Sequence, residues 1–291
     1  MENNHLKAIL ISSLGVLFMS FESLLIKLAS IEAVVFAFYV GIFMFISINT
    51  ILFSTKKSKT ILIYKEGMKA IIICGFLFGL SNIFFITAIK TTSVANTVMI
   101  FASAPLFSAL YTYLIYKEKS KKNIYISSFF IAVGLFVIFS AQLGGGDLLG
   151  NIYALICVNL FALSFVVLAK HKNANRFAIT AFAGLSAAVI SFLFVNDFLI
   201  DISTLIILLL AGVIVAPISR VLMGIGTKSL PASEISLLFI IETVMAPIWV
   251  WIVLKEVPAN STFIGGSIIL LTLFLNSAYI LKMNKTTTII K

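Results

Sequence analysis

Residues 93–118 read SVANTVMIFASAPLFSALYTYLIYKE, and residues 231–256 read PASEISLLFIIETVMAPIWVWIVLKE. The two segments align at an offset of 138 residues, at which Phe101 falls on Phe239. Each is an apolar run, long enough for one membrane-spanning helix, that ends in a Lys-Glu pair. The chain therefore contains an internal repeat, and the repeated unit is a hydrophobic helix.

The composition around these segments excludes an ordinary soluble domain. Of the 291 residues, 61% are hydrophobic and only 11% are charged, whereas a globular domain carries about 25% charged residues. So little polar surface cannot cover a soluble body, and we expect a lipid bilayer as the main solvent. The net charge of +10 does not indicate nucleic-acid binding, because the lysines occupy short gaps between apolar runs rather than one basic face.

Hydropathy predicts ten spans. A span needs about 20 residues, because the hydrocarbon core is about 30 Å thick and a helix rises about 1.5 Å per residue. Backbone polar groups in lipid must be paired within the segment, so the spans are helices. The first is expected to be a retained helix rather than a signal peptide. The ten stretches are 8–29, 33–53, 70–89, 93–115, 124–141, 151–169, 177–195, 202–225, 232–254 and 262–281.

Basic residues predict the orientation. Of the 21 Lys and Arg residues, 17 fall on the side that holds both termini, and only Lys27, Lys90 and Lys255 fall on the other. The remaining one, Arg220, lies inside a span. Because loops rich in Lys and Arg stay in the cytoplasm, we expect a multi-pass protein of the inner membrane with both termini cytoplasmic.

An odd number of spans per half inverts the second copy of the repeat. We expect one half at residues 1–143 and the other at 144–291, joined by the glycine-rich link that begins at Gly144. Spans 1 and 6 align at an offset near 143, which places Lys27 over Lys170. Inverted repeats build many secondary transporters, because two similar halves can pack in two exchanged ways around a site near the midplane.

These two segments are similar to the drug/metabolite transporter superfamily, of the ten-helix EamA type. The resemblance covers nearly the whole chain, and its landmarks are Asn82, Ala88, Ser93, Ala95, Pro105 and Glu118 in the first half and Ser233, Glu242 and Glu256 in the second. Such proteins often carry a Glu-Pro pair in span 9. Here Thr243 follows Glu242, and Pro247 stands one turn later, which displaces the expected helix break.

The resemblance implies transport of a small organic solute, a class that includes amino acids, metabolites, nucleotide-linked sugars and drugs. It also implies a central cavity formed mainly by spans 1, 3, 4, 6, 8 and 9. It does not identify the solute, because the substrate varies far more than the fold.

Ionisable groups inside spans are costly and are therefore the first candidates for a functional site. Glu242 lies about 15 Å from either end of its span, too deep to reach water, so it is a candidate for proton coupling or a carboxyl held neutral between helices. Glu22 either binds substrate or protons, or reaches partway to the outer face. Arg220, three residues after Pro217, either binds a carboxylate, pairs with Glu22 or Glu242, or extends to the cytoplasmic end.

Four further polar residues are weaker candidates. Glu234 begins span 9, where a carboxylate complements the helix dipole, and it occupies the repeat position of Asn96. The amides of Asn82, Asn96 and Asn159 either line the site or join helices by hydrogen bonds. Trp249, near the end of span 9, is expected in an interfacial aromatic belt.

The sequence favours no enzymatic activity and no cofactor. It holds no glycine-rich phosphate loop and no cluster of metal ligands, and its two cysteines, Cys74 and Cys157, lie in apolar segments without a metal or redox motif. We expect a secondary active transporter of an amino acid or amine-containing solute, exported or imported and coupled to protons, acting as a monomer or homodimer. The alternatives are an uncoupled facilitator and a non-transporting membrane scaffold or receptor.

Overall fold

The computed structural model describes residues 2–57, 59–118, 122–140, 148–171, 174–226 and 232–289. The first half consists of α1 (Glu2–Leu28), α2 (Ala33–Lys56), α3 (Lys59–Glu66), α4 (Met68–Thr91), α5 (Val94–Phe101), α6 (Ala104–Tyr116) and α7 (Lys122–Ser140). The second consists of α8 (Leu148–Lys170), α9 (Arg176–Phe192), α10 (Ile202–Leu209), the π-helix η1 (Leu210–Val215), α11 (Ala216–Gly226), α12 (Ala232–Leu254) and α13 (Asn260–Ile289).

These helices form the ten predicted crossings. Within the described residues, seven helical segments are long and apolar enough to cross a membrane, and three apolar helices are shorter, at Arg176–Phe192, Leu238–Leu254 and Asn260–Asn276. The fourth crossing combines α5 and α6, and the eighth combines α10, η1 and α11. The predicted fold class, an all-helical membrane protein of ten spans, is confirmed. The predicted boundary at residues 143 and 144 lies outside the described residues.

Two crossings are less regular than predicted. The fourth was expected to be one helix, yet α5 ends at Phe101 and α6 begins at Ala104. Pro105 explains the break, because its ring clashes with the carbonyl four residues earlier, at Phe101. In the eighth crossing Pro217 follows a π-helical turn. The break expected near Pro247 is absent, since α12 continues through that proline, and that prediction was wrong.

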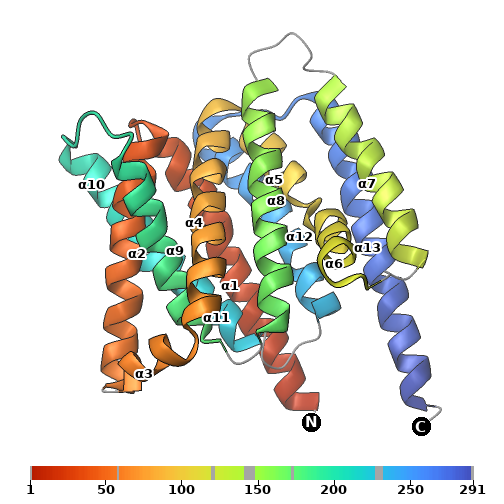
Figure 1. Cartoon of the computed structure of the whole chain (residues 1–291). Helices are drawn as coiled ribbons and strands as arrows, with labels where there is room; N and C mark the ends of the chain where they lie inside the picture. Colours follow the sequence, from red (N-terminus) through yellow and green to blue (C-terminus); the bar gives the residue numbers. More distant parts are fainter. Residues whose placement is uncertain are drawn as a thin grey trace.

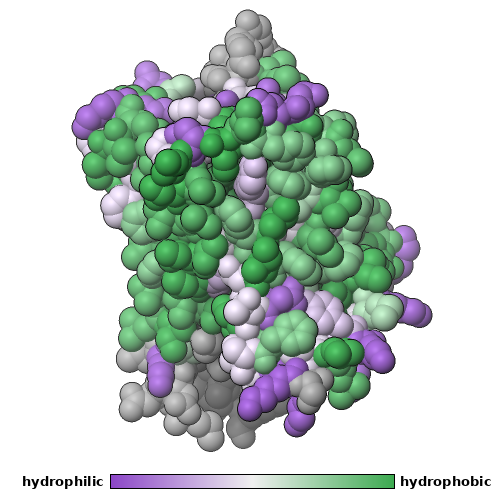
Figure 2. Space-filling model, turned by 90° about the vertical axis from the view of Figure 1, so that its left-hand side faces the viewer, coloured by the Kyte–Doolittle hydropathy of each residue, from purple (hydrophilic) through white to green (hydrophobic). Residues whose placement is uncertain are grey.

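The surface matches a lipid environment. Figure 2 shows that hydrophobic side chains cover the middle of one face, while hydrophilic side chains gather toward its two ends. The first turns of α1 and the last turns of α13 lie at the same end of the bundle (Figure 1). We call this end the terminal face and the other end the opposite face. The prediction that the terminal face is cytoplasmic stays a prediction.

Helix packing follows the inverted repeat. The repeat relates spans 1 to 5 with spans 6 to 10, so the contact of α4 with α8 corresponds to that of α1 with α11. Likewise, the contact of α1 with α12 corresponds to that of α6 with α8. The extensive contacts of α2 with α9, and of α7 with α13, each join two equivalent spans. All of these contacts lie between the halves, so the repeat determines how the two halves meet.

Glycines allow the closest of these approaches. A Cβ atom built on Gly41 of α2 would lie 2.6 Å from the Gly184 carbonyl oxygen of α9, and one built on Gly184 would lie 2.7 Å from the Gly41 carbonyl oxygen. Such distances are shorter than real Cβ contacts, and the atoms met belong to the backbone. Glycine at such positions allows the backbones of two membrane helices to approach each other closely.

We therefore expect Gly184→Ala to destabilise the protein by about 1–3 kcal/mol, the usual cost of overpacking. Gly67→Ala is the matched control, because its Cβ would meet first the flexible tip of Ile71, at 3.1 Å. The measurement is the midpoint of thermal unfolding of the purified variants in detergent. Equal midpoints for the two variants would show that the close approach of α2 and α9 is not required.

Candidate functional site

An ion pair joins the two halves inside the bundle. Glu22 of α1 is 3% exposed, and Arg220 of α11 donates a hydrogen bond from Nη1 to Glu22 Oε2 at 3.0 Å. Gly15 helps to bring these helices together, because a Cβ built on it would lie 3.0 Å from the Ser219 carbonyl oxygen. Arg220 therefore pairs with Glu22, one of its two expected carboxylate partners in the membrane. The expectation that Glu22 reaches partway to the outer face is wrong.

Glu242 adds a second carboxyl group to this region. It is 3% exposed, at the middle of α12, and its side chain makes no hydrogen bond to any described residue. It lies within electrostatic range of both Glu22 and Arg220. Helix α1 packs against both α11 and α12, so spans 1, 8 and 9 carry two buried acidic side chains and the partly exposed Arg220 on neighbouring helices. We call these three residues the charged triad.

The triad is incompletely satisfied. Among the described residues, Glu22 Oε1 has no hydrogen-bond partner, and the same is true of the buried hydroxyls of Ser12 and Ser23 on the same helix. Native proteins leave few buried polar atoms unpaired. Glu22 Oε1 and the adjacent Ser23 hydroxyl are therefore available to a further hydrogen-bonding group.

An aromatic pair flanks the triad and was not predicted as part of a site. Trp249 stacks on Phe21, with ring centroids 4.7 Å apart and planes at 18°, and its Nε1–H donates to Ser20 Oγ at 3.0 Å. The Trp249 ring therefore packs against α1, and the expectation of an interfacial belt stays a prediction. The spacing of seven residues between Trp249 and Glu242 places both on one helix face, and this was the signal that could have indicated it.

A phenylalanine cluster meets at the same interface between the halves. Phe161 of α8 lies against Phe101 at 4.5 Å and Phe239 at 6.3 Å between ring centroids. Phe101 and Phe239 occupy equivalent positions in the two copies of the internal repeat. The repeat thus supplies one ring from each half, and Phe161 packs between them.

Two of the remaining candidates form hydrogen bonds with residues outside the triad. Asn96 joins helices, since its Nδ2 donates to Thr92 Oγ1 at 3.1 Å and its Oδ1 accepts from the Thr262 hydroxyl. Asn159 Oδ1 accepts from the Tyr111 hydroxyl at 2.9 Å. Asn82 is partly buried on α4, without a hydrogen bond to a described residue. The side chain of Glu234, in the first turn of α12, lies outside the part that the structure describes.

The fold and its buried charges define a class: a multi-pass membrane protein built from two inverted five-helix repeats. The model of the EamA-like transporter family matches residues 6–140 and again residues 148–278. The chain belongs to the EamA-like transporter family. The suspected relationship to the drug/metabolite transporter superfamily is therefore confirmed.

Solved structures share this fold. In one described as a crystal structure of a protein, the match covers 94% of this chain and 96% of that chain, with a TM-score of 0.67 and 16% sequence identity. At that identity the likeness concerns the fold alone. No curated protein matches the chain at a significant level.

Proposed function

We propose that this protein is a secondary active transporter that exchanges protons for a small organic solute carrying an amine. The single observation that carries the proposal is the buried triad of Glu22, Glu242 and Arg220, in which acidic groups outnumber basic ones. The family supports transport of a small molecule across a membrane. The solute class and the coupling are inferred from the charges.

The charge balance of the triad explains the coupling. Arg220 offsets one carboxylate, and in the structure its ion pair is with Glu22. A second carboxylate at Glu242, if ionised, would leave one unbalanced negative charge away from water, which is strongly unfavourable. Either a proton on a carboxyl group or a bound ammonium group removes that charge. Proton and amine therefore compete for the same site, and such competition produces exchange.

The surroundings of the triad suit an amine. Glu22 Oε1 and the Ser23 hydroxyl, which have no partner among the described residues, can accept hydrogen bonds from an ammonium group. The Trp249 ring stacks on Phe21, the chain neighbour of Glu22. Aromatic faces attract cations, most strongly for tryptophan. If the solute is an amino acid, its carboxylate would bind the Arg220 guanidinium.

The experiment is uptake into proteoliposomes that carry an imposed pH gradient. The probes are radiolabelled putrescine, choline and the twenty common amino acids, each with and without a proton ionophore. We expect at least one amine to be driven by the gradient in the native protein, with the drive lost in Glu242→Gln. Glu118→Gln is the control, because Glu118 is 58% exposed and lies outside the triad.

Each outcome decides between the candidates. Full gradient-driven uptake in Glu242→Gln would contradict the role of Glu242. If the native protein takes up the solute at the same rate with and without the proton ionophore, it is a facilitator without proton coupling. Absence of uptake for every amine and amino acid would overturn the proposed solute class, and a lack of any solute flux is what the non-transporting scaffold or receptor predicts.

A further inference from the structure

Within the described part of the chain, an ion pair joins the halves at each face of the bundle. At the opposite face, Lys27 Nζ at the end of α1 lies 3.3 Å from Glu256 Oε2, just after α12. At the terminal face, Lys170 Nζ at the end of α8 lies 2.6 Å from Glu118 Oε1, just after α6. In each pair, one residue belongs to the first half and its partner to the second.

The inverted repeat relates these pairs to each other. The alignment places Lys27 over Lys170, and Glu118 over Glu256. The operation that exchanges the halves therefore converts the opposite-face pair into the terminal-face pair. The two pairs are equivalent and lie at opposite ends of the interface between the halves. These are the places where a passage between the halves would open and close.

The two pairs differ in how firmly they are held. The Lys27 and Glu256 side chains are 20% and 26% exposed, against 46% and 58% for Lys170 and Glu118. Lys27 also donates to the Thr92 carbonyl at 2.9 Å, and Glu256 Oε1 accepts from the backbone N–H of Val94 at 2.9 Å. Among the described residues, the terminal-face pair adds a cation–π contact, in which Lys170 Nζ lies 4.6 Å from the centre of the Tyr116 ring, and no further hydrogen bond from either side chain.

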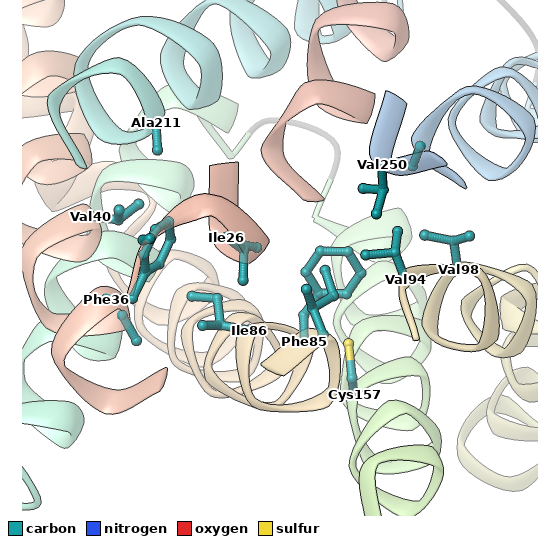
Figure 3. Packing of buried hydrophobic residues seen from close by; sticks show 14 of the residues in the cluster. Ile26, Phe36, Val40, Phe85, Ile86, Val94, Val98, Cys157, Ala211 and Val250 are labelled. Atoms are coloured by element: carbon teal, nitrogen blue, oxygen red, sulfur yellow. The ribbon is translucent and has the colours of Figure 1, made fainter. Parts of the chain in front are cut away.

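An apolar seal lies below the opposite-face pair. Ile26 of α1, Val94 and Val98 of α5 and Val250 of α12 are fully buried or nearly so and belong to one cluster, as Figure 3 shows. The cluster takes residues from both halves, directly below the ion pair. The opposite face is thus closed by charge and by packing. Toward the terminal face, Ile71, Leu168 and Ile179 form another buried apolar cluster between the halves, and the ion pair there is of the exposed kind that contributes little to stability.

We propose that the Lys27–Glu256 and Lys170–Glu118 pairs are alternating latches, each stabilising closure of its own face. This inference rests on the proposed function, because latches have meaning only if the halves move. In this structure both pairs are formed, so both faces are closed, and the opposite-face pair has the additional hydrogen bonds. Opening that face breaks the Lys27–Glu256 pair, and opening the terminal face breaks the Lys170–Glu118 pair.

Breaking one ion pair or the other is expected to shift the conformational equilibrium in opposite directions. A conformational equilibrium shifts only through interactions that differ between its two states. Breaking the opposite-face latch favours the state open at that face. Breaking the terminal-face latch favours the state open at the terminal face, in which the opposite face stays closed.

The experiment measures how fast a buried cysteine at the seal reacts with a membrane-impermeant maleimide added at the opposite face of oriented vesicles. The reporter is Val98→Cys, at a position 1% exposed, in a chain that also carries Cys74→Ala and Cys157→Ala. We expect Lys27→Glu to raise the labelling rate about tenfold, which corresponds to about 1.4 kcal/mol. Lys27→Arg, which keeps the charge, stays near the original rate.

The second arm uses the terminal-face pair. Lys170→Glu is expected to slow labelling of the same cysteine, and the exchanged pair Lys170→Glu with Glu118→Lys is expected to restore the original rate. Lys255→Glu is the control for altered charge, because Lys255 is exposed and is adjacent in sequence to Glu256. The exchanged variant also shows whether a single charge reversal acts through the pair or through misfolding.

The proposal is overturned if Lys27→Glu and Lys170→Glu change labelling in the same direction, or if neither changes it. Labelling depends on neither the solute nor the proton gradient. Opposite shifts in labelling together with a fully coupled Glu242→Gln variant would therefore retain the latches and reject the proposed coupling site. Loss of coupling in Glu242→Gln without opposite shifts in labelling would retain the proposed coupling site and reject the latches.

Discussion

Arg220→Met is expected to destabilise the protein by about 3–5 kcal/mol, because it removes one partner of a buried ion pair and leaves the other charge uncompensated. The stranded group is Glu22, whose side chain is 4% exposed. Its Oε1 already has no partner among the described residues, so loss of the Arg220 bond leaves both carboxylate oxygens unpaired. The measurement is thermal unfolding of the purified variant in detergent.

Two controls separate pairing from simple loss of a basic residue. Lys170→Met removes the base of an exposed pair, whose side chains are 46% and 58% accessible, and is expected to cost at most about 1 kcal/mol. The double variant Glu22→Gln with Arg220→Met has no stranded charge and should regain much of the lost stability. Equal losses for Arg220→Met and Lys170→Met would contradict the buried pair.

Trp249→Ala is expected to reduce stability by up to about 3 kcal/mol, in line with large-to-small aromatic replacements in packed interiors. The change removes the stack on Phe21 and the hydrogen bond to Ser20. Trp249→Phe keeps a ring for the stack and loses only the hydrogen bond, so its loss should be about 1 kcal/mol. Thermal unfolding and amine uptake are measured on the same preparations.

Trp251→Ala is the matched control, because Trp251 lies on the same helix and is 53% exposed. We expect it to leave uptake unchanged and to shift the unfolding midpoint little. Equal losses of stability and of uptake in Trp249→Ala and Trp251→Ala would contradict the role of the Phe21 stack and the Ser20 hydrogen bond.

The fold could be predicted from the sequence because the features that determine it extend over many residues. A span of about 20 apolar residues and a repeat at a constant offset are both visible without contacts. The short helix α3 was missed, since eight residues with three charges, Lys59–Glu66, give no hydropathy signal. The break before Pro105 was missed because the span was judged by its length, whereas the steric effect of the proline was decisive.

The site was predictable only in part. Depth alone required that Glu242 face the interior, because no glutamate side chain can reach water from there. The choice of Glu22 as the partner of Arg220 depends on how α1 and α11 pack, across 198 residues of sequence, and no local pattern encodes it. Asn96 shows the same limit, since its contact with Thr262 joins residues 166 positions apart in the sequence.

The most direct test of alternating access around the triad is the accessibility of Ser20→Cys from the two faces of the membrane. Ser20 is fully buried and accepts the Trp249 hydrogen bond beside the triad, and the reporter is placed in a chain with Cys74→Ala and Cys157→Ala. We predict that an impermeant maleimide labels this cysteine in both right-side-out and inside-out vesicles. Labelling from one face only, or from neither, would contradict the account.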